Sequence, residues 1–96
     1  MRVISKKPLR DFWERHPESK PVLDAWFKTA SRVRANSFAE LRQTFASADY
    51  VDGITMFNVG GNRYRIAGVV HYDKQRLYVR QVMTHSEYDR NDWRRK

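Results

Sequence analysis

The hydrophobic pattern of the chain changes period near its middle, and this change limits the folds open to it. Before about residue 45, apolar residues return every three or four positions, which is typical of amphipathic helices. After about residue 50, they form short runs rich in Val, Ile, Tyr and Phe, which are typical of strands. Helices followed by an antiparallel group of strands predict an α+β fold with the helices packed on one sheet face.

The first half predicts an opening strand and a helical hairpin. Arg2–Ser5 is short and β-branched, and Lys6–Arg15 has apolar residues at helical spacing, with Pro8 in its first turn. Pro17 ends this helix, because the residue before a proline is pushed out of the helical region. A second helix is expected to begin with Ser19 as its N-cap and to bury one face, made of Val22, Leu23, Trp26, Phe27, Ala30 and Val33.

Two shorter helices are expected farther along the chain. Ser37 and Glu40 stand at the spacing of a capping box, which predicts a third helix that ends near Phe45. The closing segment Ser86–Lys96 is predicted to form a short helix with Ser86 as its N-cap.

Three strand-like segments fill the second half, at Tyr50–Val59, Tyr64–His71 and Leu77–Met83. Gly60-Gly61-Asn62 and Asp73-Lys74-Gln75 separate them as hairpin turns, which makes the strands an antiparallel meander. With the opening strand, we expect a mostly antiparallel sheet of about four strands. A chain of 96 residues has too little apolar volume for two cores, so we expect a single domain over residues 1–96.

Composition excludes several classes of protein. The chain has no cysteine, which excludes a disulfide framework, a zinc ribbon and a thiol nucleophile. No segment approaches the roughly 20 apolar residues that span a bilayer, and no long apolar run follows the first positive charges. We therefore expect a cytoplasmic protein without an export signal or a membrane anchor.

The chain is strongly basic, with 19 Lys and Arg against 11 Asp and Glu, a formal charge of +8 and a pI near 10.2. An excess this large favours a polyanionic partner. The alternative is a protein that is simply basic, and charge alone does not decide between the two. A positive surface beside the sheet would bind a phosphate backbone regardless of base sequence.

Two arginines lie where a turn enters the strand Tyr64–His71. The pleat places Arg63 and Arg65 on one face and Tyr64 and Ile66 on the other, and both faces are apolar farther along, as in a central strand. A guanidinium held rigidly at the start of such a strand suits two-point binding of a phosphate. The alternative is a pair of solvated arginines, or arginines that pair with acidic side chains.

His85 and Tyr88 follow the last strand and are three residues apart, so one helical turn would bring imidazole and phenol to the same side. Histidine changes charge near neutral pH, which suits it to acid–base catalysis. The alternative is a hydrogen-bonded corner without catalytic function. We expect no metal site, because His16, His71 and His85 have none of the spacing of helical metal ligands.

Two motifs resemble those of a known family. They are Phe57-Asn58-Val59-Gly60-Gly61-Asn62 with Arg65, and Val82-Met83-Thr84-His85 with Glu87-Tyr88-Asp89. Both resemble the HigB toxins of bacterial type II toxin–antitoxin systems, a family similar in turn to the RelE-like ribonuclease toxins. The resemblance also includes residues 3–9 and 37–45, so it covers nearly the whole chain and implies a RelE-like fold.

The resemblance implies an endoribonuclease that cuts messenger RNA, usually during translation on the ribosome. It further implies an antitoxin with a helix-turn-helix domain, through which the complex contacts operator DNA. Such toxins work without a metal or other cofactor: the ribose 2′-hydroxyl attacks the adjacent phosphate and leaves a cyclic phosphate and a free 5′-hydroxyl. This reaction needs a base, an acid and cations at the phosphorane.

Carried onto this sequence, the resemblance implies roles for individual residues. Arg65 would stabilise the phosphorane, His85 would act as general acid or base, and Tyr88 would orient the 2′-hydroxyl or the target base. Asn62 would shape the turn or contact the nucleotide. Further RNA contacts that only position the substrate are expected from residues outside the matched pattern, namely Arg63, Arg80, Lys6 and Lys7.

Two other functions fit a chain of this kind. ParE-like relatives share the architecture and inhibit DNA gyrase by binding it, but they lack the histidine and tyrosine pattern near the last strand. A non-catalytic RNA-binding or ribosome-associated module would use the same basic surface, and it would tolerate loss of Arg65 or His85.

Overall fold

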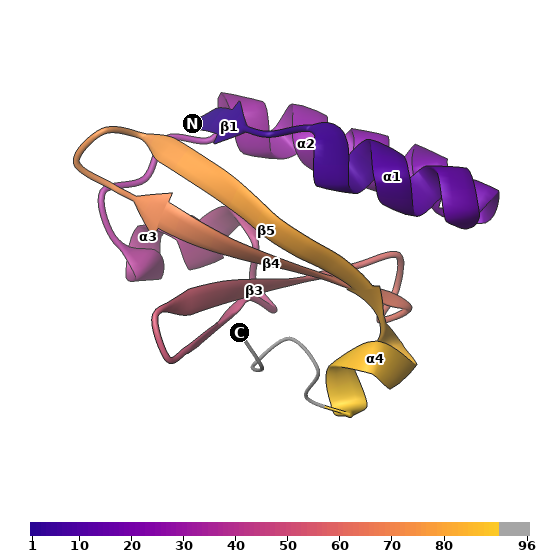
Figure 1. The fold of residues 1–96 in the computed structure, drawn as a ribbon. Coiled ribbons are helices and arrows are strands. Elements are labelled where there is room, and N and C mark those ends of the chain that lie inside the picture. Colours follow the sequence, from indigo (N-terminus) through magenta and orange to yellow (C-terminus); the bar gives the residue numbers. More distant parts are fainter. Residues whose placement is uncertain (91–96) are drawn as a thin grey trace.

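Five strands form one sheet, in the order β1-β5-β4-β3-β2, and the helices α1 and α2 lie side by side over it (Figure 1). The structure is a computed structural model that describes residues 1–90. Its elements are β1 (Arg2–Ile4), α1 (Lys7–Arg15), the 3-10 turn η1 (Pro17–Ser19), α2 (Lys20–Arg32), α3 (Phe38–Thr44), β2 (Asp49–Val51), β3 (Ile54–Val59), β4 (Tyr64–His71), β5 (Arg76–Thr84) and α4 (His85–Asp89).

The predicted α+β fold is confirmed. The strands β2 to β5 form the expected antiparallel meander, and β1 pairs parallel with β5. The parallel pair arises because α1 and α2 separate β1 from the meander along the chain, as a crossover requires. None of the helices within residues 1–90 is both long and apolar enough to cross a membrane.

The prediction of one continuous strand at Tyr50–Val59 is wrong, because the segment forms two strands joined by a tight turn. Asp52 and Gly53 have φ angles of 52° and 82°, so both lie in the left-handed region. An Asp-Gly pair favours this conformation, which matches the twist of a two-residue hairpin. The sheet therefore has five strands, with β2 at its edge.

The predicted helix caps are partly wrong. Ser19 makes no cap hydrogen bond, since its hydroxyl donates to the His16 carbonyl at 2.7 Å within the η1 turn. Ser37 does cap α3 by accepting from the Glu40 amide at 3.2 Å, although the Glu40 carboxylate accepts from the Asn36 amide instead of closing the box.

The closing helix α4 begins one residue earlier than predicted and uses another cap. Thr84, not Ser86, accepts from the Glu87 amide at 3.2 Å, and the Glu87 carboxylate accepts from the Thr84 amide at 2.9 Å. Thr84 ends β5 in extended conformation, as an N-cap residue requires. The remainder of the predicted segment, residues 91–96, lies outside the described residues.

Both faces of β4 are buried, as predicted for a central strand. Tyr64 and Ile66 belong to the main core between the sheet and the helices, whereas Ala67 belongs to a smaller cluster with Met56 and Met83. Arg65 lies among these buried positions and is only 6% exposed. A charged group therefore occupies a buried position in the middle strand of the sheet.

A β-bulge interrupts β5 at Arg80. Ala67 pairs with Gln81 and Gly68 pairs with Val79, so Arg80 has no partner on β4. The extra residue shifts the alternation of side chains, which explains how Val79 and Val82, three residues apart, both join the main core.

Gln75 ties the β4–β5 turn to the segment after α2. Its side-chain amide donates to the carbonyls of Ala35 at 2.6 Å and Tyr72 at 2.8 Å, and its carbonyl accepts from the Ala35 amide at 3.3 Å.

We predict that Gln75→Glu lowers the free energy of unfolding by about 1–3 kcal/mol, because it removes both donations at constant shape. Urea unfolding would measure this, with Gln43→Glu on the exposed face of α3 as the control. Equal urea midpoints for Gln75→Glu and the wild type would contradict this stabilising role of the Gln75 side chain.

Candidate active site

Asn62, on the turn between β3 and β4, orients the guanidinium of Arg65. Asn62 has a φ of 82°, which asparagine tolerates better than most residues. In this conformation its carbonyl oxygen accepts from Arg65 Nη1 and its Oδ1 accepts from Arg65 Nη2, both at 3.1 Å. The Tyr64 carbonyl accepts a third bond from Nη1 at 3.3 Å. The guanidinium is thus fixed in one orientation before any ligand binds.

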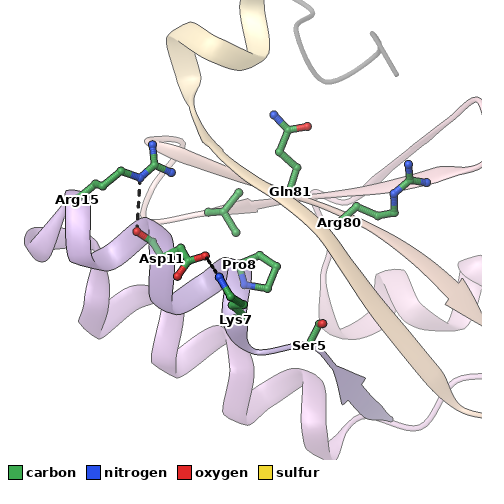
Figure 2. A pocket seen from close by; sticks show the side chains of 8 residues that line it. Ser5, Lys7, Pro8, Asp11, Arg15, Arg80 and Gln81 are labelled. Atoms are coloured by element: carbon green, nitrogen blue, oxygen red, sulfur yellow. Dashed lines mark hydrogen bonds and ion pairs between the residues drawn. The ribbon is translucent and has the colours of Figure 1, made fainter.

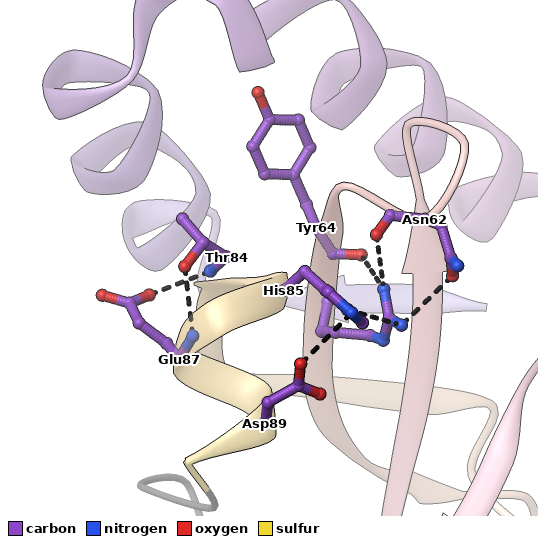
Figure 3. A network of polar contacts seen from close by, with 7 residues as sticks. Asn62, Tyr64, Thr84, His85, Glu87 and Asp89 are labelled. Atoms are coloured by element: carbon purple, nitrogen blue, oxygen red, sulfur yellow. Dashed lines mark hydrogen bonds and ion pairs between the residues drawn. The ribbon is translucent and has the colours of Figure 1, made fainter.

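His85 lies between Arg65 and Asp89 (Figure 3). Its Nδ1 is 3.2 Å from Arg65 Nη2, and its Nε2 is 3.2 Å from Asp89 Oδ2. A guanidinium can only donate and a carboxylate can only accept, so these contacts assign the proton to Nε2 and leave Nδ1 as an acceptor. The imidazole is held as the tautomer whose free lone pair faces the arginine.

Tyr88 completes the cluster from the next turn of α4. The carbon at the centre of the Arg65 guanidinium lies 5.0 Å from the centre of the Tyr88 ring, within cation–π distance. The ring also packs on the small apolar cluster of Met56, Ala67 and Met83. The aromatic ring therefore shields one side of the arginine while the imidazole contacts another.

The position of α4 depends on local backbone contacts. The capping box of Thr84 and Glu87 fixes its first turn, and the His85 amide donates to the Arg63 carbonyl at 3.0 Å. This second bond joins the start of α4 to the turn that carries Asn62. The two segments that build the site are thus linked directly, although more than 20 residues separate them along the chain.

Arg65 has an uncompensated charge. Its hydrogen-bond acceptors are neutral, and within residues 1–90 no carboxylate forms an ion pair with it. Burial without a counter-ion is costly for a cation, which makes the site a strong attractor for an anion. The side chains of His85 and Asp89 are 51% and 58% exposed, so a ligand can reach the cluster from solvent.

The other predicted RNA contacts do not join this cluster. Arg63 is exposed, with its guanidinium over the Tyr64 ring at 5.5 Å. Lys6 is 3.8 Å from Asp24 and lies 4.3 Å from the Phe27 ring centre, on the helical hairpin. Lys7 and Arg80 line a separate groove between α1 and β5.

Metal chemistry has no evident place in residues 1–90, where no three His, Asp or Glu side chains gather as potential ligands. His16 stacks on the Phe12 ring at 4.5 Å, and His71 lies 5.1 Å from the Tyr78 ring. The three histidines are thus engaged in different parts of the fold.

Sequence reasoning quoted Thr84 and Asp89 within a motif but assigned neither of them a role in the site. Asp89 stands four residues after His85, a spacing that places two side chains on the same helix face. This signal was present in the sequence. The capping role of Thr84 was concealed because Ser86 is an equally good cap residue two positions later.

Comparison with known proteins agrees with this geometry. Residues 19–91 match the HigB toxin family, described as a RelE-like toxic component of a toxin–antitoxin system. The chain belongs to the HigB toxin family. It is 38% identical over 92 residues to the mRNA interferase toxin HigB of Escherichia coli strain K12, which covers 93% of this chain and 88% of the relative.

Other HigB relatives match over similar lengths. The mRNA interferase HigB of Shigella flexneri is also 38% identical, with the same coverage. A second HigB mRNA interferase, from Escherichia coli O6:H1, is 25% identical over 93 residues, which is 94% of this chain and 90% of the relative. The family match thus extends over the strands and helix that build the candidate site.

We predict that Thr84→Val impairs activity without removing a charged group. The substitution keeps the β-branched shape but deletes the cap oxygen, which costs about 1 kcal/mol and loosens the turn that carries His85. Thr84→Ser retains the oxygen and is the matched control. RNA cleavage by the two purified variants would be compared at a temperature where both are folded. Equal rates for Thr84→Val and Thr84→Ser would show that the cap does not position the site.

Proposed function

We propose that the protein is the toxic component of a toxin–antitoxin system and an endoribonuclease that cuts messenger RNA at the Arg65–His85 cluster. One observation carries this proposal: a buried guanidinium, which no carboxylate of residues 1–90 pairs with, faces an imidazole whose tautomer a carboxylate fixes. Membership of the HigB family and the names of the relatives support the same activity.

The proposed reaction is a transphosphorylation within the RNA. A base takes the proton of the ribose 2′-hydroxyl, the 2′ oxygen bonds to phosphorus, and the bond from phosphorus to the 5′ oxygen breaks. A proton passes to that 5′ oxygen, and the products are a cyclic phosphate and a 5′-hydroxyl. Positioning and charge stabilisation supply most of the catalysis in such a step.

Arg65 binds the scissile phosphate and stabilises the phosphorane. The Asn62 oxygens and the Tyr64 carbonyl hold its guanidinium in one orientation, so the bond from Nη2 to His85 is the contact that a phosphate oxygen replaces. Phosphate binding competes with the contact from Nη2 to His85. The substrate thereby releases the Nδ1 lone pair at the moment when a base is needed.

His85 acts as the general base through Nδ1. After it takes the proton from the 2′-hydroxyl, the imidazolium keeps its Nε2 proton on Asp89, whose carboxylate stabilises the new charge. Tyr88 orients the ribose or the target base beside the arginine. Asn62 acts by positioning Arg65 and the turn.

Membership of the family supports a set of partners for the protein. The substrate is messenger RNA, bound on the translating ribosome in the cytoplasm, and no metal or other cofactor takes part. An antitoxin with a helix-turn-helix domain neutralises the toxin, and operator DNA is contacted only through that complex. Arg63, Lys7 and Arg80 contribute nonspecific contacts to the RNA, and Lys6 has a weaker claim because it is engaged with Asp24.

We predict that RNA cleavage disappears in Arg65→Ala and Arg65→Lys, because alanine lacks the charge and lysine lacks the two-point fork. The first measurement would map new RNA 5′ ends by primer extension on a translated reporter, soon after the toxin is induced. Arg63→Ala, which removes an exposed arginine two positions away, is the control and should still cut. Circular dichroism of the purified variants would establish that each is folded.

The same experiment distinguishes the rival functions. Growth arrest by the wild type with intact RNA would point to a protein target such as gyrase. Arrest that persists in folded Arg65→Ala and His85→Ala would point to a non-catalytic RNA or ribosome-binding module. Either result would overturn the proposed cleavage.

We predict a separate effect of Asp89→Asn. The amide can still lie beside Nε2, but it cannot stabilise the imidazolium, so kcat should fall on the order of tenfold or more with KM little changed. Asp89→Glu retains the carboxylate and should recover part of the rate. Steady-state cleavage of a short RNA would measure both. A change confined to KM would assign Asp89 to substrate binding instead.

A further inference from the structure

A polar groove lies between α1 and the outer edge of β5 (Figure 2). It exists because β1 pairs only with residues Arg76–Tyr78 of β5, and β5 continues to Thr84. Beyond Tyr78, α1 runs beside the strand and leaves a hollow of about 410 Å³. The groove is lined by Ser5, Lys7, Pro8, Asp11, Arg15, Arg80, Gln81 and Val82.

The groove is positively charged. Three basic side chains and one acidic side chain line it, which leaves a formal charge of +2. Lys7 is paired with Asp11 at 2.8 Å, and Arg15 donates only to the Asp11 backbone carbonyl, at 3.4 Å. Within residues 1–90, neither Arg15 nor Arg80 forms an ion pair with a carboxylate. Two guanidiniums from different elements are therefore available to an anion.

Two features of the backbone shape this positively charged groove. The bulge at Arg80 removes that residue from pairing with β4, and bulges of this kind re-aim a side chain. Ser5, at the other side of the groove, has a φ of 72°, a strained conformation for serine. α1 starts two residues later, at Lys7, and has no acidic residue in its first turn; the carboxylate of the groove, that of Asp11, is paired with Lys7.

β5 runs from the groove to the start of the helix that carries His85. Gln81, which lines the groove, pairs with Ala67, and Ala67 lies two residues from Arg65 on the same face of β4. Arg80 and His85 are five positions apart, which corresponds to roughly 16 Å along a strand. A short RNA strand bound at the candidate active site can therefore extend toward the groove.

We propose that this groove binds the RNA backbone flanking the cleavage position, with Arg15 and Arg80 contacting phosphates. This inference rests on the proposed function, because it takes RNA as the substrate of the adjacent site. It differs from a general basic surface in being confined to two guanidiniums that line one hollow from different elements. It also adds Arg15, which no sequence motif indicated.

The test compares two double variants that remove the same charge. The double variant Arg15→Gln/Arg80→Gln removes both guanidiniums from the groove. Lys28→Gln with Arg32→Gln is the matched control, since these residues line another hollow, between α2 and α3. Binding of a fluorescent 2′-O-methyl oligonucleotide of about 12 nucleotides is measured against salt concentration, because RNA without a free 2′-hydroxyl cannot be cut.

The groove variant should bind with a shallower salt dependence than the wild type. Two lost phosphate contacts reduce the slope of log K against log salt by about 1.4, which makes the affinity loss between 50 and 200 mM salt about sevenfold smaller. The control variant should retain the wild-type slope, and a dinucleotide, too short to reach the groove, should not distinguish the variants.

Three outcomes would overturn the proposal. Equal changes in both double variants would reduce the effect to net charge, and an unchanged slope in the groove variant would exclude phosphate contacts there. Loss of antitoxin binding with unchanged RNA binding would assign the groove to the protein partner. Cleavage of unmodified RNA by the wild type is measured in parallel: groove-dependent binding without any cleavage would overturn the proposed enzyme and leave the groove as an RNA site.

Discussion

The organisation of this protein depends on one buried guanidinium. Arg65 occupies a position on the central strand β4 where an apolar side chain would be expected, and it is satisfied there only by neutral acceptors. Its burial requires the left-handed turn at Asn62, which supplies two of those acceptors, and it requires the Tyr88 ring, which covers it from α4. Within residues 1–90 no carboxylate pairs with this charge, so the hydrogen bonds and the aromatic ring are what offset the cost of its burial.

The contacts from Arg65 through His85 to Asp89 connect one buried group with two exposed groups, and the two kinds of group have different functions. The arginine is almost inaccessible and fixed, which favours strong and directional binding of charge in a medium of low dielectric constant. The imidazole and carboxylate are half exposed on a five-residue helix, which leaves them accessible to a ribose. The helix itself is too short to be stable alone, so the capping box at Thr84 and the bond from the His85 amide to Arg63 place the catalytic groups.

Local patterns predicted much of the fold, whereas contacts between distant segments could not be read from them. The α+β class, the hairpin turn at Gly60-Gly61-Asn62 and the cap at Ser37 follow from residue types within a few positions. The Asp52-Gly53 turn was also readable, yet the apolar run around it concealed the break. The pairing of β1 with β5 and the bulge at Arg80 depend on register across the sheet, which no window of sequence contains. Hence Arg65 and His85 were identified from their motifs, but their contact was not.

The same distinction explains why the basic surface is not uniform. Of the cations predicted to contact RNA, Lys6 is paired with Asp24 and lies over aromatic rings, and Lys7 is paired with Asp11. Both lysines are therefore less available to RNA than the sequence suggested. Arg80 is available because a bulge removes it from the β4 pairing, and Arg15 meets the same groove only because the fold brings α1 beside β5. A net charge of +8 attracts RNA from a distance, but short-range geometry decides which cations can hold it. In this fold, Arg15 and Arg80 line a groove beside β5, and β5 leads directly into the helix that carries His85.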